Sequence, residues 1–193
     1  MKFYAHTATP PDGKPDPDQG HWQLLSTHLR NVAQLAKQFA APLRLSAEAE
    51  LAGLLHDLGK YRDEFQAYLR GERASSVETQ HAIYGAAWAL EPHQQLGTVL
   101  AVAGHHAGLH DLTDAQAAAT KPYVLNALPE LARRIESELG KLPVPPGVPP
   151  HVEIAQSQEL STELYTRLLF AASSMPTVST PLAGPQRHRG ICR

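Results

Sequence analysis

Apolar residues recur at steps of three and four along much of this chain, and that spacing predicts amphipathic helices. The clearest case runs from Trp22 to Phe39, with Leu25 and Leu29 on the apolar stripe and His28 at its edge. The aromatic side chains at the two ends of this stretch are expected in the core. An imidazole beside such a stripe is costly to bury without a partner, so His28 needs an explanation.

A second helix is expected to begin at Ser46, whose hydroxyl can cap the first turn, and to stop at Gly59. His56 and Asp57 would then lie in its last turn. This places an imidazole and a carboxylate next to each other at a helix end.

Further helices are expected over residues 61–69, 81–90, 96–106 and 156–172. The stretch 115–139 should be broken into pieces at Pro122 and Pro129, because proline interrupts a helix interior. No segment shows the sustained alternation of polar and apolar residues that predicts strands. The expected fold is therefore all-α, with a single domain.

The composition is that of an ordinary globular domain. Of the 193 residues, 42% are hydrophobic and 19% charged, and the net charge is -2. The chain therefore lacks a general basic character, although bound divalent cations can manage a polyanionic substrate locally. The single cysteine, Cys192, excludes an intrachain disulfide and a cysteine-based zinc cluster, and it fits a reducing, cytoplasmic setting. Apolar runs stay well short of the roughly 20 residues that span a bilayer, so no membrane association is expected.

The 11 histidines are the unusual feature of the composition. Several fall in or beside the predicted helices, and with one aspartate they form a set of candidate ligands: His28, His56, Asp57, His81, His105 and His106. Imidazole and carboxylate groups suit divalent metals, and a shared aspartate can bridge two of them. We therefore expect a two-metal site between helices, with the ion left open among Mn, Fe, Ni, Co, Mg and Zn.

The segment AGLLHDLGKY at residues 52–61 resembles the signature of the HD superfamily of metal-dependent phosphohydrolases. Its surroundings sharpen the resemblance. They contain, in order, YAHT at 4–7, W-x5-H at 22–28, FQAYL at 65–69, HAIYGA at 81–86 and AGHHAGLHD at 103–111. Together these motifs look like the HD nuclease of the type I CRISPR interference machinery, which accompanies a helicase.

The resemblance covers residues 1–172 and implies a domain that cuts single-stranded DNA with two metal ions. It implies that the first ion is held by His28, His56 and Asp57, and the second by Asp57, His81, His105 and His106. It also implies a helicase domain or subunit and the CRISPR guide-RNA complex as partners.

Two more residues have expected roles near the ligands. Lys60 follows the His-Asp pair by three positions and can offer a point charge to a substrate phosphate. It is expected to be catalytic together with Asp57. His6, from the YAHT motif, is expected either to join the ligands or to support them by a hydrogen bond.

Residues 173–193 depart from the family, in which the last helix continues into a segment close to LVDAD. Here the chain reads SSMPT from Ser173 and continues rich in proline, serine and threonine, so a poorly ordered tail is expected. If SSMPT is encoded TCG TCG ATG CCG ACT, one C added in front restores Leu-Val-Asp-Ala-Asp. We interpret the tail as a shifted reading frame that replaces a ligand aspartate by Met175, with reduced activity as the consequence.

Two alternatives stay open at this point. One is an HD phosphohydrolase that acts on nucleotides or cyclic dinucleotides, which would use similar ligands around an enclosed pocket. The other is a catalytically inactive interaction module, because the last carboxylate is missing.

Overall fold

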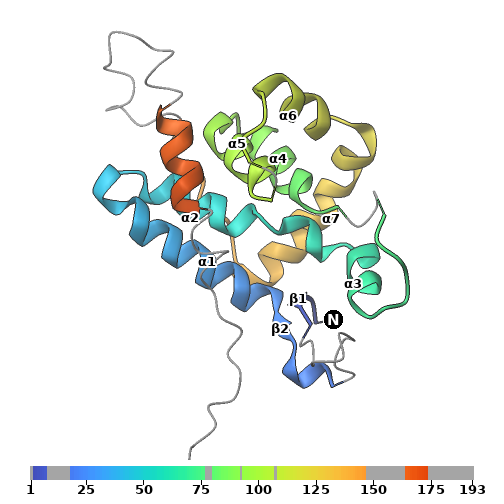
Figure 1. The fold of residues 1–193 in the computed structure, drawn as a ribbon. Helices are drawn as coiled ribbons and strands as arrows, with labels where there is room; N and C mark the ends of the chain where they lie inside the picture. The colour runs from blue at the N-terminus through green and yellow to red at the C-terminus, as the bar shows by residue number, and fades with distance from the viewer. Residues whose placement is uncertain are drawn as a thin grey trace, which may run out of the picture.

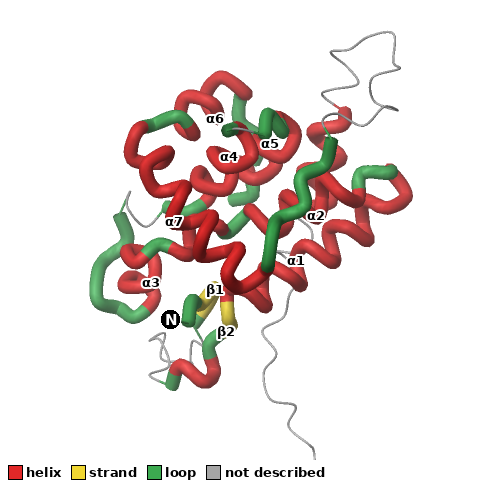
Figure 2. The backbone as a smooth tube through the Cα atoms, turned by 180° about the vertical axis from the view of Figure 1, so that it is seen from behind, coloured by secondary structure: helices red, strands yellow, loops and turns green. Residues whose placement is uncertain are grey.

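The computed structural model describes residues 2–7, 18–76, 80–91, 93–106, 108–146 and 164–173. This part of the chain is mostly helical, which confirms the all-α prediction (Figures 1 and 2). The elements in order are β1 (Tyr4–His6), η1 (Gln19–His21), β2 (Gln23–Leu24), α1 (Leu25–Ala40), η2 (Ala41–Leu43), α2 (Ser46–Leu55), η3 (Leu58–Tyr61), α3 (Asp63–Leu69), α4 (Ala82–Leu90), α5 (Leu96–Gly104), α6 (Leu112–Ala119) and α7 (Pro122–Leu139). A further helical segment covers residues 164–173.

Helices α1 and α2 form an antiparallel pair on one side of the molecule, and α4 to α7 pack together on the other (Figure 1). Helix α1 buries Leu25, Leu29 and Val32 on the face that the sequence predicts. Leu51 and Leu55 of α2 are also fully buried. Burying a leucine side chain contributes about 1.5–3 kcal/mol, so this shared core holds the first half of the fold together.

Helix α4 lies against the end of α2, and a glycine makes the close approach possible. A Cβ atom at Gly85 would collide with the carbonyl oxygen of Leu55. Gly59 has a similar role between η3 and α4, because a Cβ there would collide with the backbone of His81. The segment that follows α2 therefore packs against His81, the residue that precedes α4.

The small antiparallel ribbon of β1 and β2 was not expected from the sequence (Figure 2). It pairs Tyr4 with Leu24, and the Leu25 N–H donates to the Phe3 carbonyl at 2.9 Å. Pairing with β1 holds residues 23 and 24 extended, so α1 begins three residues later than the predicted start at Trp22. Strands this short are too brief to show alternation.

Several helix details also differ from the predictions. Ser46 does not cap α2; it is the first helical residue, and its hydroxyl donates to the Lys37 carbonyl at 3.2 Å. Helix α7 runs through Pro129 without interruption, because its buried face, with Val124 and Ile135, compensates for the lost hydrogen bond. Phe39 is 45% exposed and not in the core.

Some predictions fall outside the described residues. These include the start of the last helix before residue 164 and the tail from residue 174 onward, so the division at residue 172 stays a prediction. In the described ranges, no helix has both the length and the apolar character needed to cross a membrane.

Candidate metal centre

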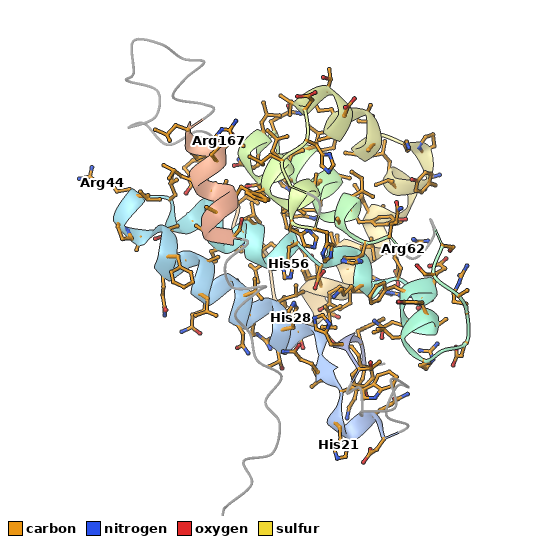
Figure 3. The ribbon with its side chains drawn as sticks, viewed as in Figure 1. His21, His28, Arg44, His56, Arg62 and Arg167 are labelled. Atoms are coloured by element: carbon orange, nitrogen blue, oxygen red, sulfur yellow. The ribbon has the colours of Figure 1, made fainter. Side chains whose placement is uncertain are left out.

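The candidate ligands come together where helices begin and end. His28 lies inside α1, while His56 and Asp57 directly follow α2 and His81 directly precedes α4. His105 and His106 follow the end of α5. The sequence predicted His56 and Asp57 in the last turn of a helix that stops at Gly59. In the structure α2 ends at Leu55, so both residues lie just after the helix. Figure 3 shows His28 and His56 facing each other in the middle of the molecule, far from His21 at its edge.

Two of these histidines are oriented by the helix that they follow. The Nδ1 atom of His56 lies 2.8 Å from the Gly53 carbonyl oxygen, and the Nδ1 atom of His105 lies 2.7 Å from that of Val102. A carbonyl oxygen only accepts, so Nδ1 carries the proton in both rings. Each neutral ring then presents the lone pair of Nε2, as metal-binding histidines usually do.

The carboxylate of Asp57 lies between two groups of imidazoles. Its Oδ2 atom is 3.1 Å from His28 Nε2 and 3.2 Å from His56 Nε2. Its Oδ1 atom is 3.1 Å from His81 Nε2 and 3.7 Å from His105 Nε2. Each carboxylate oxygen therefore faces its own set of ring nitrogens.

The remaining histidine extends the Oδ1 side. His106 Nε2 lies 2.8 Å from His81 Nε2. The ligand atoms of Asp57, His81, His105 and His106 all lie within 4.8 Å of one another, close enough to share one ion.

Burial keeps three of these imidazoles, those of His56, His81 and His106, neutral at pH 7. It lowers the pKa of His56 and of His81, and it lowers that of His106 to about 4, with help from the neighbouring His105. Burial alone would raise the pKa of Asp57, but the adjacent His56 ring and the Lys60 ammonium outweigh it and hold that pKa well below its usual value. At neutral pH an ionised Asp57 carboxylate therefore lies beside the neutral rings of His56 and His81.

The donor set fits a divalent metal ion. His105 Nε2 and Asp57 Oδ1 are buried without a hydrogen-bond partner among the described residues, although buried polar atoms are normally paired. His56 Nε2 and Asp57 Oδ2, both electron-pair donors, lie 3.2 Å apart. A cation between these atoms satisfies them, and imidazole and carboxylate are the ligand types of Mn, Fe, Ni, Co and Zn.

Lys60 is buried at the same place. Its Nζ atom lies 2.9 Å from Asp57 Oδ2 and donates to the Ala5 carbonyl at 3.2 Å. The amine therefore contacts the carboxylate itself, and its expected contact with a substrate phosphate stays a prediction.

His6 also reaches this cluster, from strand β1. Its ligand atom and those of His28 and Asp57 lie within 4.8 Å of one another. Burial lowers the pKa of His6 to about 4, with a further contribution from the Lys60 charge. The YAHT motif indicated this residue in the sequence, without deciding its role.

A cleft of about 560 Å³ opens beside the Oδ1 side of the centre. His81 and His106 lie at one wall, while Lys121 and Tyr123, at the start of α7, line another part. His110, from the AGHHAGLHD motif, also lines it. The sequence did not indicate Lys121 or Tyr123, because both lie outside the ligand motifs.

Comparison with known proteins gives the family. No curated protein matches the chain. The family model described as "HD domain" matches residues 25–143, which include α1, α2, α4, α5 and every proposed metal ligand except His6. The chain therefore belongs to the HD domain family, a superfamily of metal-dependent phosphohydrolases.

Proposed function

We propose that this protein is a metal-dependent phosphodiesterase that cuts single-stranded DNA in CRISPR antiviral defence. The observation that carries the proposal is the position of Asp57, whose Oδ1 and Oδ2 atoms face separate groups of histidines. Such an arrangement fits two divalent ions with a shared carboxylate.

Each residue of the site would have a separate role in hydrolysis. Asp57, His28 and His56 would hold one ion, and Asp57, His81, His105 and His106 the other. Ions held there would supply Lewis acidity and would activate a water for hydrolysis of the phosphodiester. Lys60 would balance the negative charge of Asp57 and, on the substrate side, that of the phosphate.

The cleft beside His81 and His106 supports a nucleic-acid strand as the substrate. Lys121 at its wall can pair with a phosphate, and the half-exposed ring of Tyr123 offers a face for a base. A duplex is too wide to bring a phosphate close to the buried Asp57 carboxylate, whereas a single strand can bend toward it. The preference for single strands follows from this difference.

The link to CRISPR defence rests on the order of the motifs in the sequence. In that setting a helicase domain or subunit would supply the single strand, under the control of the guide-RNA complex. The proposed shift of reading frame would remove an aspartate at Met175, which lies outside the described residues. We expect the present chain to cut DNA more slowly than one with the restored segment.

Hydrolysis of a nucleotide is the second candidate. The cleft volume of about 560 Å³ is in the range of small-molecule sites, and one nucleotide would fit beside His106. The two candidates share the metal centre and differ in the length of substrate that the cleft accepts.

A cleavage assay separates these possibilities. Labelled single-stranded DNA, duplex DNA and mononucleotides are incubated with Mn²⁺, Ni²⁺, Co²⁺ or Mg²⁺ and three proteins: this chain, its Asp57→Asn variant, and a chain that reads Leu-Val-Asp-Ala-Asp from residue 173. We expect single-strand cleavage, fastest with the restored chain and absent with Asp57→Asn. Turnover of mononucleotides alone would favour the second candidate. Binding of metal by both chains without turnover of any substrate would favour an inactive module.

A further inference from the structure

We infer that His6 is a ligand of the ion on the Oδ2 side of Asp57, where it forms a donor set with His28 and Asp57. The inference rests on the proposed metal centre and adds a residue to it that lies outside the part matched by the family model. The structure brings the three ligand atoms of His6, His28 and Asp57 within 4.8 Å of one another.

The two sides of Asp57 are unequal without His6. Three histidines serve the Oδ1 side: His81, His105 and His106. On the Oδ2 side, Asp57 contacts His28 and His56, so an ion there would have two imidazoles and one carboxylate oxygen. His6 would add a further imidazole on this side, next to His28 and Asp57.

The backbone that carries His6 is fastened to the centre at several points. Gln66 holds Tyr4 from both sides: its Oε1 accepts from the Tyr4 N–H at 3.0 Å, and its Nε2 donates to the Tyr4 carbonyl at 2.9 Å. The same Nε2 donates to the Lys60 carbonyl at 2.7 Å. Gln66 thus joins the strand to the segment that follows Asp57.

A second link lies directly beside His6. Lys60 Nζ donates to the carbonyl of Ala5 and also contacts Asp57 Oδ2. The side chains of Phe3 and Ala5 are buried on the opposite side of the strand from His6. Alternation along the strand then turns His6 toward the cluster, where its ring lies edge-on to His28 with centroids 5.1 Å apart.

This geometry explains the N-terminal ribbon. A two-stranded sheet of five residues adds little stability by itself, and such ribbons are marginal in water. Its fastening by two buried polar side chains, Gln66 and Lys60, fixes the position of His6. That fixed position suits a ligand, although the His6 side chain is itself exposed to solvent on one side.

Titration calorimetry of the full chain with Mn²⁺ tests the inference. We expect His6→Ala to weaken the binding of one ion by about tenfold or more, since even the loss of a residue that only supports a ligand costs 10–100-fold. His6→Asp should recover most of that loss, because a carboxylate can replace the imidazole as a ligand. His21→Ala, which removes an exposed histidine remote from the centre, should bind Mn²⁺ as the unchanged chain does.

The visible spectrum of the Co²⁺-loaded proteins gives a second readout, since it reports the atoms bound to the ion. We expect His6→Ala to change this spectrum, and circular dichroism will show that each variant is folded. Unchanged affinity and an unchanged Co²⁺ spectrum in folded His6→Ala would overturn the inference while leaving the metal centre in place. Absence of binding to the unchanged chain would overturn both.

Discussion

The Nε2 atoms of His28 and His56 lie 3.1 Å apart in the interior of the protein, although they come from different helices. The Nδ1 proton of His56 is committed to the Gly53 carbonyl, so its Nε2 atom presents a lone pair to its neighbour. A carboxylate oxygen of Asp57 lies at the same point. The fold thus places the Nε2 atoms of His28 and His56 and a carboxylate oxygen of Asp57 where one cation could bind them.

Metal binding should therefore stabilise the fold. At free Mn²⁺ of 100 times the dissociation constant, we expect a gain of about 2.7 kcal/mol. For a chain of this size the melting temperature should rise by about 5–10 °C. Differential scanning calorimetry with Mn²⁺ and then with excess EDTA measures the effect. Asp57→Asn should show no such rise, and an equal rise in that variant would place the ion elsewhere.

Lys60 should matter most when metal is absent. Lys60→Met leaves the buried Asp57 carboxylate without its amine partner, and we expect a loss of about 3–5 kcal/mol in the free energy of unfolding in EDTA. Mn²⁺ should reduce that loss, because it supplies positive charge to the same carboxylate. Urea denaturation in both conditions measures the difference.

Lys37→Met is the matched control for Lys60. The Lys37–Glu50 pair is just as short, at 2.8 Å, but its lysine side chain is 51% exposed. Its removal should cost less than about 1 kcal/mol. Equal losses from both variants would contradict the account of a buried charge centre.

The metal-free protein should lose stability as the pH falls. Burial lowers the pKa of His6 and of His106 to about 4, from an ordinary value of 6.5. Between these values the unfolded chain binds more protons than the folded one, so the free energy of unfolding decreases from pH 6.5 towards pH 4. The lowered pKa of Asp57 acts in the same direction at still lower pH.

Urea midpoints at pH 7, 6 and 5 in EDTA measure this decline. The double variant His6→Asn/His106→Asn should show a shallower decline, because asparagine does not titrate. A midpoint that stays constant or rises on acidification would show that these histidines are not held neutral by the fold.

The cleft should affect long substrates more than small ones. Tyr123→Ala removes the exposed ring, and stacking of one base on an aromatic ring contributes about 1–3 kcal/mol. We expect fluorescence anisotropy to show at least about fivefold weaker binding of a single-stranded oligonucleotide. The binding of Mn²⁺, measured by calorimetry, should be unchanged, because Tyr123 is not a ligand. Equal effects on both would assign Tyr123 to the fold and not to the substrate.

Periodicity predicted the helices well where one face is buried. Helix α1 is an example, because its apolar stripe and its core face coincide. The boundaries were less predictable. The start of α1 depends on pairing with β1, and the course of α7 through Pro129 depends on packing against distant helices. Neither contact can be predicted from the residues around the helix end or around Pro129.

The candidate site was partly predictable for a related reason. His56 and Asp57 are adjacent in the sequence, and the motifs around them indicated the other ligands. The cleft was not predictable, since Lys121 and Tyr123 carry no motif and reach His106 only through the packing of α4 with α6 and α7. The burial of Lys60 depends likewise on strand β1.

The central claim is that Asp57 holds divalent ions between two groups of histidines. Anomalous X-ray diffraction from crystals of the protein soaked in Mn²⁺ tests it most directly. We predict two anomalous peaks about 3.5–4 Å apart, one beside each carboxylate oxygen of Asp57. Mn²⁺ peaks that lie elsewhere, or no peak within reach of Asp57 in crystals that contain the metal, would contradict the claim.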